Sequence, residues 1–439
     1  MLQLSEQQLQ TKKAFISDYF CAPNAAEGSK LDANANVTEK NIATLEAELL
    51  KDCFIQINRT LVKDKISELF SPALAQEYQR QIQDHEIYVH DETSLKPYCT
   101  SISMYPFLLD GLTKLGGESK APKHLESFCG SFVNLIFAIS AQFAGAVATV
   151  EFLTYFDYFA RKEYGDDYLT SHKSAIENHL QHVVYAINQP AAARGYQSVF
   201  WNISVFDRFY FASMFEDFVF PDFSKPSWQS VEQLQMFFLN WINHEREKAV
   251  LTFPVITAAM LTENGQCKDQ DFARELAGEK ARGNSFFVYL SDSADSLASC
   301  CRLRNEISDN TFSYTLGAGG VATGSINVIT INMNRLVQDD RDLAEEITKI
   351  QKYQVAYRKL MEDYFAKGAL SVYNAGFISL DKQFLTIGIN GMAEAAEYAG
   401  HTVGNNPGYK HFVSDHLKVI YRANQAARKE YGYMFNTEF

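Results

Sequence analysis

The chain has 439 residues, 46% of them hydrophobic, and a formal net charge of −13 at pH 7. This composition is typical of a globular protein with a large core, and the length suits one large barrel. Because an acidic chain lacks the basic surface that nucleic acid requires, we expect no nucleic-acid partner. A local basic pocket for a small anion is still compatible with this charge.

The seven cysteines are odd in number and irregularly spaced, which argues against a disulfide framework and favours a reducing, cytoplasmic setting. With no C-x-x-C pair, we expect no metal site in this chain. The polar N-terminus lacks the hydrophobic region of a signal peptide. The apolar stretch Phe132–Leu153 contains Asn134, Gln142 and Glu151, so we interpret it as a buried helix and expect no membrane association.

In chain order, residues 1–85 are predicted to form a polar helical region and residues 86–439 an α/β unit. Helical patterns occupy about 126–163, 169–188, 229–247, 342–370 and 392–400, the last closed by Gly400. Strand patterns occupy 86–91, 198–207, 252–260, 284–291, 325–333 and 384–391. Short buried strands that alternate with long helices predict an α/β architecture and favour a barrel.

Two cysteine segments could carry chemistry. Cys300 and Cys301 are adjacent, and the nearby Arg302 and Arg304 would stabilise a thiolate or an anionic substrate. Two small buried residues in a turn explain the same pattern. Cys99 begins a predicted strand after a polar turn, and a structural role for it is the simpler interpretation.

The segment TIGING places Gly388 and Gly391 between a predicted strand and a predicted helix. Unpaired backbone N–H groups at the start of a helix form an anion site, so this turn is a candidate phosphate site. A plain tight turn is the alternative.

Several of these segments, taken together, resemble the large catalytic protein of the anaerobic ribonucleotide reductases, a glycyl-radical family. The resemblance covers about residues 32 to 439 and rests on the order of six segments. They are HDETSLKPYC (His90–Cys99), RGYQSVFWNISVFD (Arg194–Asp207), TFPVIT (Thr252–Thr257), SCCRLR (Ser299–Arg304), GSINVITINMNRL (Gly324–Leu336) and FLTIGINGMAEAAEYAG (Phe384–Gly400).

The resemblance implies a ten-stranded α/β barrel made of two antiparallel halves, with a finger loop inside it that carries a thiyl-radical cysteine. The implied reaction replaces the 2′-hydroxyl of a ribonucleoside triphosphate with hydrogen. The thiyl radical removes the 3′ hydrogen atom, and the barrel shields the radical from solvent.

The same resemblance assigns roles to individual residues. Cys301 matches the thiyl cysteine, and Cys99 matches the cysteine that donates hydrogen toward the 2′ position. Asn332 matches a strand asparagine near the sugar, although a structural role is an equal alternative. The substrate-binding residues are expected to be Cys300, Gly388, Asn390 and Gly391.

The segment FNTEF ends this sequence, whereas the family continues with further barrel, a four-cysteine zinc site and the glycyl-radical loop. We therefore expect the barrel to be incomplete in this chain, with the zinc and the radical glycine on a partner chain. An activase that contains an iron–sulfur cluster and uses S-adenosylmethionine would install the radical on that partner. A shortened fragment or a relative that has lost catalysis would also account for the missing segments.

Other expectations concern partners. The family implies deoxynucleotide and ATP effectors and a homodimer, but the sequence leaves the effector residues and the reductant open. Two alternative functions are a glycyl-radical enzyme of the formate-lyase type and a catalytically inactive nucleotide-binding relative.

Overall fold

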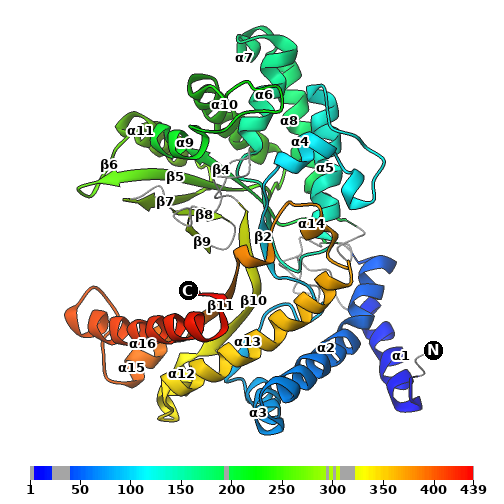
Figure 1. Ribbon diagram of the computed structural model, residues 1–439, viewed down its shortest axis with the longest axis vertical. Coiled ribbons are helices and arrows are strands. Elements are labelled where there is room, and N and C mark those ends of the chain that lie inside the picture. Colours follow the sequence, from blue (N-terminus) through cyan, green and yellow to red (C-terminus); the bar gives the residue numbers. More distant parts are fainter. Residues whose placement is uncertain are drawn as a thin grey trace.

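The computed structural model describes residues 4–21, 40–191, 197–292, 296–299, 303–306 and 322–438. Helices alternate along the chain with the strands of one large sheet, which confirms the predicted α/β class (Figure 1). The helices are α1 Glu6–Cys21, α2 Ile42–Leu69, α3 Pro72–Gln83, α4 Tyr105–Asp110, α5 Leu125–Ser140, α6 Phe152–Tyr164, α7 Tyr168–Ser171, α8 Lys173–Ile187, α9 Arg208–Phe215, α10 Trp228–Lys248, α11 Gln270–Ala281, α12 Met333–Gln338, α13 Leu343–Ala366, α14 Ser371–Asn374, α15 Met392–Tyr398 and α16 Pro407–Tyr431. The strands are β1 Ile87–Val89, β2 Cys99–Ser101, β3 Val147–Ala148, β4 Trp201–Phe206, β5 Val255–Glu263, β6 Gln266–Cys267, β7 Phe287–Ser291, β8 Ser296–Ser299, β9 Leu303–Glu306, β10 Thr323–Asn332, β11 Gln383–Asn390 and β12 Met434–Glu438.

The large sheet has ten strands in the order β12-β11-β10-β2-β3-β4-β5-β6, while β1 also pairs with β10 and β7 with β5. Strands β10, β11 and β12 are parallel to one another, as are β2, β3, β4, β5 and β7. The two groups meet at the antiparallel pair of β10 and β2. The sheet therefore consists of two halves of opposite direction.

Strand β12 ends this order on one side, and on the other side β7, which pairs with β5, is the last of the parallel strands. Within the part of the chain that the structure describes, neither strand pairs with a second neighbour. Closure of the sheet into a barrel therefore stays a prediction.

Helices cover the outward side of the sheet. Helices α5 and α6 place Phe132 and Phe152 against Trp201 of β4, at ring distances of 5.6 and 5.2 Å. Helices α2 and α3 pack with α13, where Tyr78 and Tyr353 lie 5.0 Å apart. Residues of α2, α3 and the sheet belong to one hydrophobic core. This packing does not test the predicted boundary at residue 85 between a helical region and an α/β unit, so that boundary stays a prediction.

The prediction of one helix over 126–163 is wrong. Helix α5 ends at Ser140, and β3 pairs with β2 and β4 before α6 begins. Gly145 approaches β2 so closely that a Cβ atom there would lie 3.1 Å from the carbonyl oxygen of Tyr98. Sheet pairing therefore overrides the helical pattern of this apolar stretch. Among the described residues, the helices lack the length and apolar character that a membrane crossing requires.

Local signals account for other boundaries. Helix α3 is separate from α2 because Ser71 caps its first turn and Pro72 opens it. Gly400, with φ +86°, follows the end of α15 as predicted for a helix C′ residue.

Candidate active site

Cys99 lies at the junction between the two halves of the sheet. It begins β2, is completely buried, and is the register partner of Ser325 on β10. The backbone of Gly324 passes so close that a Cβ atom there would lie 2.1 Å from the carbonyl oxygen of Cys99. Gln383 of β11 donates from Nε2 to the same oxygen at 3.2 Å. The position of Cys99 is therefore fixed by close packing of three strands.

The side chains of Cys99 and Ser101 point to the face of the sheet opposite Trp201. Side chains alternate along a strand, and parallel strands keep register partners on one face. Trp201 is in register with Val147 and Thr100, whereas Asn202 is in register with Ala148 and Ser101. We call the face that carries Cys99, Ser101, Asn202 and Ser204 the inner face.

A two-stranded hairpin lies over this sheet. Strand β8 pairs antiparallel with β9, β8 contacts β4, β5 and β7, and β9 contacts β10. Figure 1 shows the hairpin between the two halves of the sheet, on the side away from the α5 and α6 helices. Cys300 and Cys301, which separate the two strands in the sequence, lie outside the described residues.

The segment before Cys99 is held against β10. His90 forms a hydrogen bond between Nε2 and Oγ1 of Thr330 at 2.8 Å. Its ring also lies 4.8 Å from that of Tyr88 and 5.5 Å from that of Tyr98. Because Tyr88 is in register with Thr330, these aromatic side chains share the face of β10 that carries Thr330.

The other predicted site residues lie at the far end of β10 and β11. Asn332 and Asn390 are register partners there, and Gly391 follows at φ +74°. From Ser325, the partner of Cys99, to Asn332, the register on β11 advances six positions, from Phe384 to Asn390, which corresponds to about 20 Å of strand. The structure therefore divides the predicted residues between two places.

Asn332 has structural partners for both ends of its amide. Its Oδ1 accepts from the backbone N–H of Arg335 at 3.2 Å, which caps helix α12. Its Nδ2 donates to the carbonyl oxygen of His85 at 3.2 Å. These contacts explain Asn332 as a helix cap, and its role at the sugar stays a prediction.

The glycines of the TIGING turn are required by packing and conformation. A Cβ atom on Gly388 would lie 2.2 Å from Oγ1 of Thr330, so β10 and β11 could not keep their spacing with a larger residue. The N–H of Gly391 donates to Oδ1 of Asn390 at 2.9 Å. No side chain in the described part of the chain caps the start of α15.

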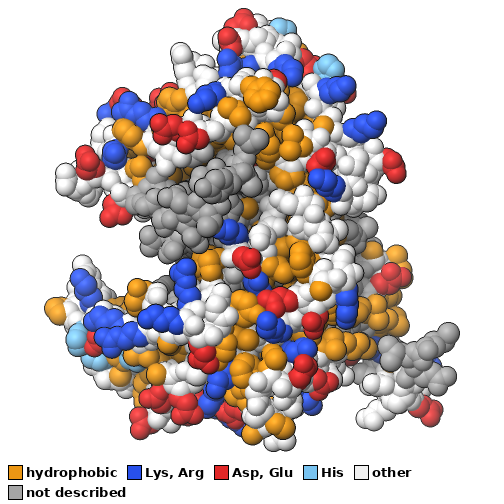
Figure 2. Space-filling model, viewed as in Figure 1, with side chains coloured by type: hydrophobic (Ala, Val, Ile, Leu, Met, Phe, Trp, Pro, Cys, Tyr) orange, Lys and Arg blue, Asp and Glu red, His pale blue; other side chains and the backbone are white. Residues whose placement is uncertain are grey.

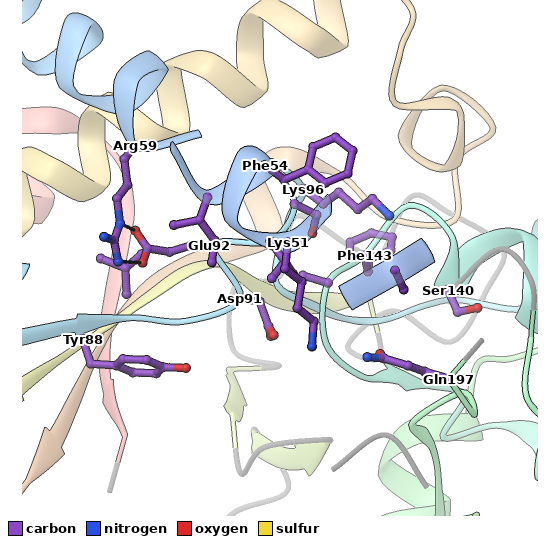
Figure 3. A pocket seen from close by; sticks show the side chains of 16 residues that line it. Lys51, Phe54, Arg59, Tyr88, Asp91, Glu92, Lys96, Ser140, Phe143 and Gln197 are labelled. Atoms are coloured by element: carbon purple, nitrogen blue, oxygen red, sulfur yellow. Dashed lines mark hydrogen bonds and ion pairs between the residues drawn. The ribbon is translucent and has the colours of Figure 1, made fainter. Parts of the chain in front are cut away.

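A cavity of about 570 Å³ lies beside the His90–Cys99 segment, between it, helix α2 and the residues that follow α5. Figure 3 shows Lys51, Asp91 and Gln197 directed into it, while Arg59 forms an ion pair with Glu92 at its wall. The volume is in the range of small-ligand sites. Its cationic and acidic side chains are mixed, so the charge alone does not select a ligand.

Asp207, the last residue of the segment Arg194–Asp207, has a structural role. Its carboxylate accepts from the backbone N–H groups of Phe209 and Tyr210, which caps α9, and of Leu261 on β5. Burial raises its pKa, and these three donors oppose that effect.

A family model described as anaerobic ribonucleoside-triphosphate reductase matches residues 46–439. The chain belongs to this family. A search of curated proteins finds no match. The family and the fold together make the protein an enzyme of ribonucleotide reduction, and they do not favour the formate-lyase alternative.

Solved reductase structures agree with this family. One described as an anaerobic ribonucleotide reductase has a TM-score of 0.85 and 29% identity, covering 98% of this chain and 69% of its own. The Thermotoga maritima enzyme with citrate in the active site has a TM-score of 0.80 and 27% identity, covering 91% and 75%. The same enzyme with dATP bound in the specificity site has a TM-score of 0.82 and 26% identity, covering 100% and 78%.

Sequence reasoning missed the polar residues of the inner face. Asn202 and Ser204 lie within the apolar run of β4, which we expected to be an ordinary buried strand. A polar side chain at every second position of such a run was the signal that could have identified them. Among the described residues, no group of three His, Cys, Asp or Glu side chains is arranged to hold a metal ion.

Proposed function

We propose that this chain binds a ribonucleoside triphosphate on its inner face and reduces it through a thiyl radical on Cys301. The observation that supports this most is the β8–β9 hairpin, whose strands flank Cys300 and Cys301 in the sequence and contact both halves of the sheet. A cysteine carried between such strands is suited to reach a substrate bound beside Cys99.

In the proposed reaction, Cys301 takes the 3′ hydrogen atom of the ribose and becomes a thiol. The sugar radical then loses its 2′-hydroxyl group as water, while the 3′-hydroxyl group gives up its proton. Cys99 gives a hydrogen atom to the 2′ position, which leaves a 3′-ketone and a thiyl radical on Cys99. An external two-electron reductant returns a hydrogen atom to Cys99 and gives one electron, with a proton, to the ketone. The resulting 3′ radical takes its hydrogen atom back from Cys301, which regenerates the thiyl radical there. The complete burial of Cys99 fits this role, because it keeps solvent away from the reacting carbon atoms.

We further propose that strands from outside residues 1–439 complete the barrel between β7 and β12 and bring the radical glycine. A glycyl radical there would supply the oxidising equivalent to Cys301. The support is the exposed apolar surface of β7, where Phe287, Val288 and Leu290 are 51%, 45% and 53% exposed. Figure 2 shows the surface hollowed between the region of β5 and α11 and the region of α15 and α16.

We also propose that the added part carries a structural zinc site, that an activase containing an iron–sulfur cluster and using S-adenosylmethionine installs the radical, and that the active form is a homodimer. Deoxynucleotides are the proposed effectors, because the similar Thermotoga maritima enzyme binds dATP in its specificity site. Phosphate binding at Gly391 is a separate proposal, because about 20 Å of strand lies between this turn and Cys99 and a triphosphate whose ribose lies beside Cys99 does not span that distance.

Anaerobic reconstitution tests the central proposal. The chain is combined with the radical-bearing segment and the activase, and the radical signal and deoxynucleotide formation are measured. We expect both to require the added segment, and Cys301→Ser to abolish product while nucleotide binding survives. Normal turnover of Cys301→Ser, with loss only in Cys300→Ser, would reverse the assignment of the two cysteines.

A further inference from the structure

The inner face contains a buried amide that nothing in the described structure satisfies. Asn202 of β4 is completely buried, and neither its Oδ1 nor its Nδ2 has a hydrogen-bond partner among the described residues. Burial of an unpaired amide costs on the order of 1–3 kcal/mol, so native proteins seldom retain one without a purpose.

Two serine side chains on the same face of the sheet also carry buried hydroxyl groups without a hydrogen-bond partner in the described structure. Ser204 lies two residues further along β4, and Ser101 is connected to Asn202 across β3 by the register through Ala148. The Oγ atoms of both serines are buried and lack a partner in the described part of the chain. These three side chains, on β2 and β4 with β3 between them, form a polar surface whose hydrogen-bonding groups a bound ligand would satisfy.

Two other buried polar side chains, Ser325 and Asn284, have partners within the protein. Oγ of Ser325, the partner of Cys99, lies 2.8 Å from Oγ1 of Thr386. Asn284 is a buried asparagine whose Nδ2 donates to the carbonyl oxygen of Leu239 and whose Oδ1 accepts from Arg246. Asn327 and Asn436 each leave a buried Oδ1 without a partner in the described structure, whereas in Asn202 both amide atoms are buried and unpaired.

The row lies next to the proposed reacting centre. Ser101 follows Cys99 by two residues on the same face, and Asn202 lies two strands from Ser101, about 10 Å across the sheet. A ribose ring that lies between Cys99 and Asn202 would contact the side chains of both residues.

The chemistry of a carboxamide matches a vicinal diol. Asn202 presents one acceptor oxygen and one NH₂ donor in a fixed plane, and each hydroxyl of a diol both donates and accepts. Serine hydroxyl groups adapt to either role. We propose that Asn202, with Ser101 and Ser204, binds the 2′- and 3′-hydroxyl groups of the ribose and selects ribonucleotides over deoxyribonucleotides. This inference rests on the proposed function, because it assigns the substrate contacts of the same site.

Equilibrium binding to the reconstituted, unactivated assembly tests the inference without turnover. CTP and 2′-deoxy-CTP are titrated under anaerobic conditions with dATP saturating, for the wild type, Asn202→Ala and Ser204→Ala. We expect Asn202→Ala to weaken CTP binding about tenfold and 2′-deoxy-CTP binding less, so that the preference for CTP falls. Ser204→Ala is expected to lower the same preference by a smaller factor.

Thermal unfolding provides the second readout, with Asn284→Ala as the matched control. Asn202→Ala should unfold at the same or a higher temperature than the wild type, because it removes an unpaired buried amide. Asn284→Ala should unfold at a lower temperature and keep the wild-type preference for CTP.

Three outcomes would overturn the inference. They are unchanged CTP affinity in a folded Asn202→Ala variant, equal weakening of CTP and 2′-deoxy-CTP, and a loss of thermal stability in Asn202→Ala as large as that in Asn284→Ala. The first would mean that Asn202 binds water only. A wild-type assembly that binds neither nucleotide would instead contradict the proposed function.

Discussion

Glu151, which lies between β3 and α6, is expected to make the stability of this protein depend on pH. Its side chain is completely buried, and Oε2 accepts from the backbone N–H of Met104 at 2.8 Å. Burial raises its pKa from 4.5 to about 8, against the opposing effect of the hydrogen bonds from Met104 and Tyr155. Glu151 is therefore protonated in the folded protein at neutral pH.

The sign and size follow from proton linkage. Between pH 4.5 and 8 the folded protein holds a proton on Glu151 that the unfolded chain has released. The free energy of unfolding therefore falls by up to about 1.4 kcal/mol for each pH unit in this window, or up to about 5 kcal/mol in all. The stabilisation is complete below pH 4.5 and is lost as pH rises through 8.

The substitution Glu151→Gln isolates this effect, because glutamine imitates the protonated carboxyl group and keeps an acceptor for Met104. We expect the variant and the wild type to unfold at similar denaturant concentrations near pH 5, and the variant to be the more stable at pH 8 to 9. Chemical denaturation across this pH range measures the difference, in which the contributions of other titrating groups cancel. A stability difference that does not change with pH would refute the raised pKa.

Three further predictions concern the active-site region. Gly324→Ala should destabilise the protein by about 1–3 kcal/mol, since the added Cβ would lie 2.1 Å from the carbonyl oxygen of Cys99. Chemical denaturation compares this variant with Gly130→Ala, where the added Cβ meets nothing within 4 Å. Equal stability of the two variants would contradict the close approach of Gly324 to Cys99. Cys99→Ala should permit exchange of the 3′ hydrogen but prevent product formation in the reconstituted assembly, and normal turnover would leave Cys99 as a strand residue only. Gly391→Val should weaken nucleotide binding if phosphate approaches this backbone, because the added side chain would block it. Gly432→Val, at a similar φ of +73° with open space around it, controls for backbone strain. Unchanged nucleotide affinity in a folded Gly391→Val variant would favour the plain turn.

The sequence by itself determined most of the longer strands and the family. Apolar, β-branched runs predicted β4, β5, β7, β10 and β11, and each is present. Strands β4, β5, β10 and β11 are mostly buried along their length, so their hydrophobicity is continuous and easily recognised. The order of the six segments was sufficient to indicate an anaerobic ribonucleotide reductase, a family that the match over residues 46–439 confirms.

Tertiary structure decided how these residues are distributed in space. Asn332 and Cys99 both come from segments that indicated the family, yet strand register separates them by about 20 Å of sheet. Packing of Gly145 against β2 interrupted the helical pattern after Ser140, which local propensity could not foresee. Asn202 became a candidate only when its burial and its missing partners were known, because hydrogen bonding is a property of neighbours far apart in the chain.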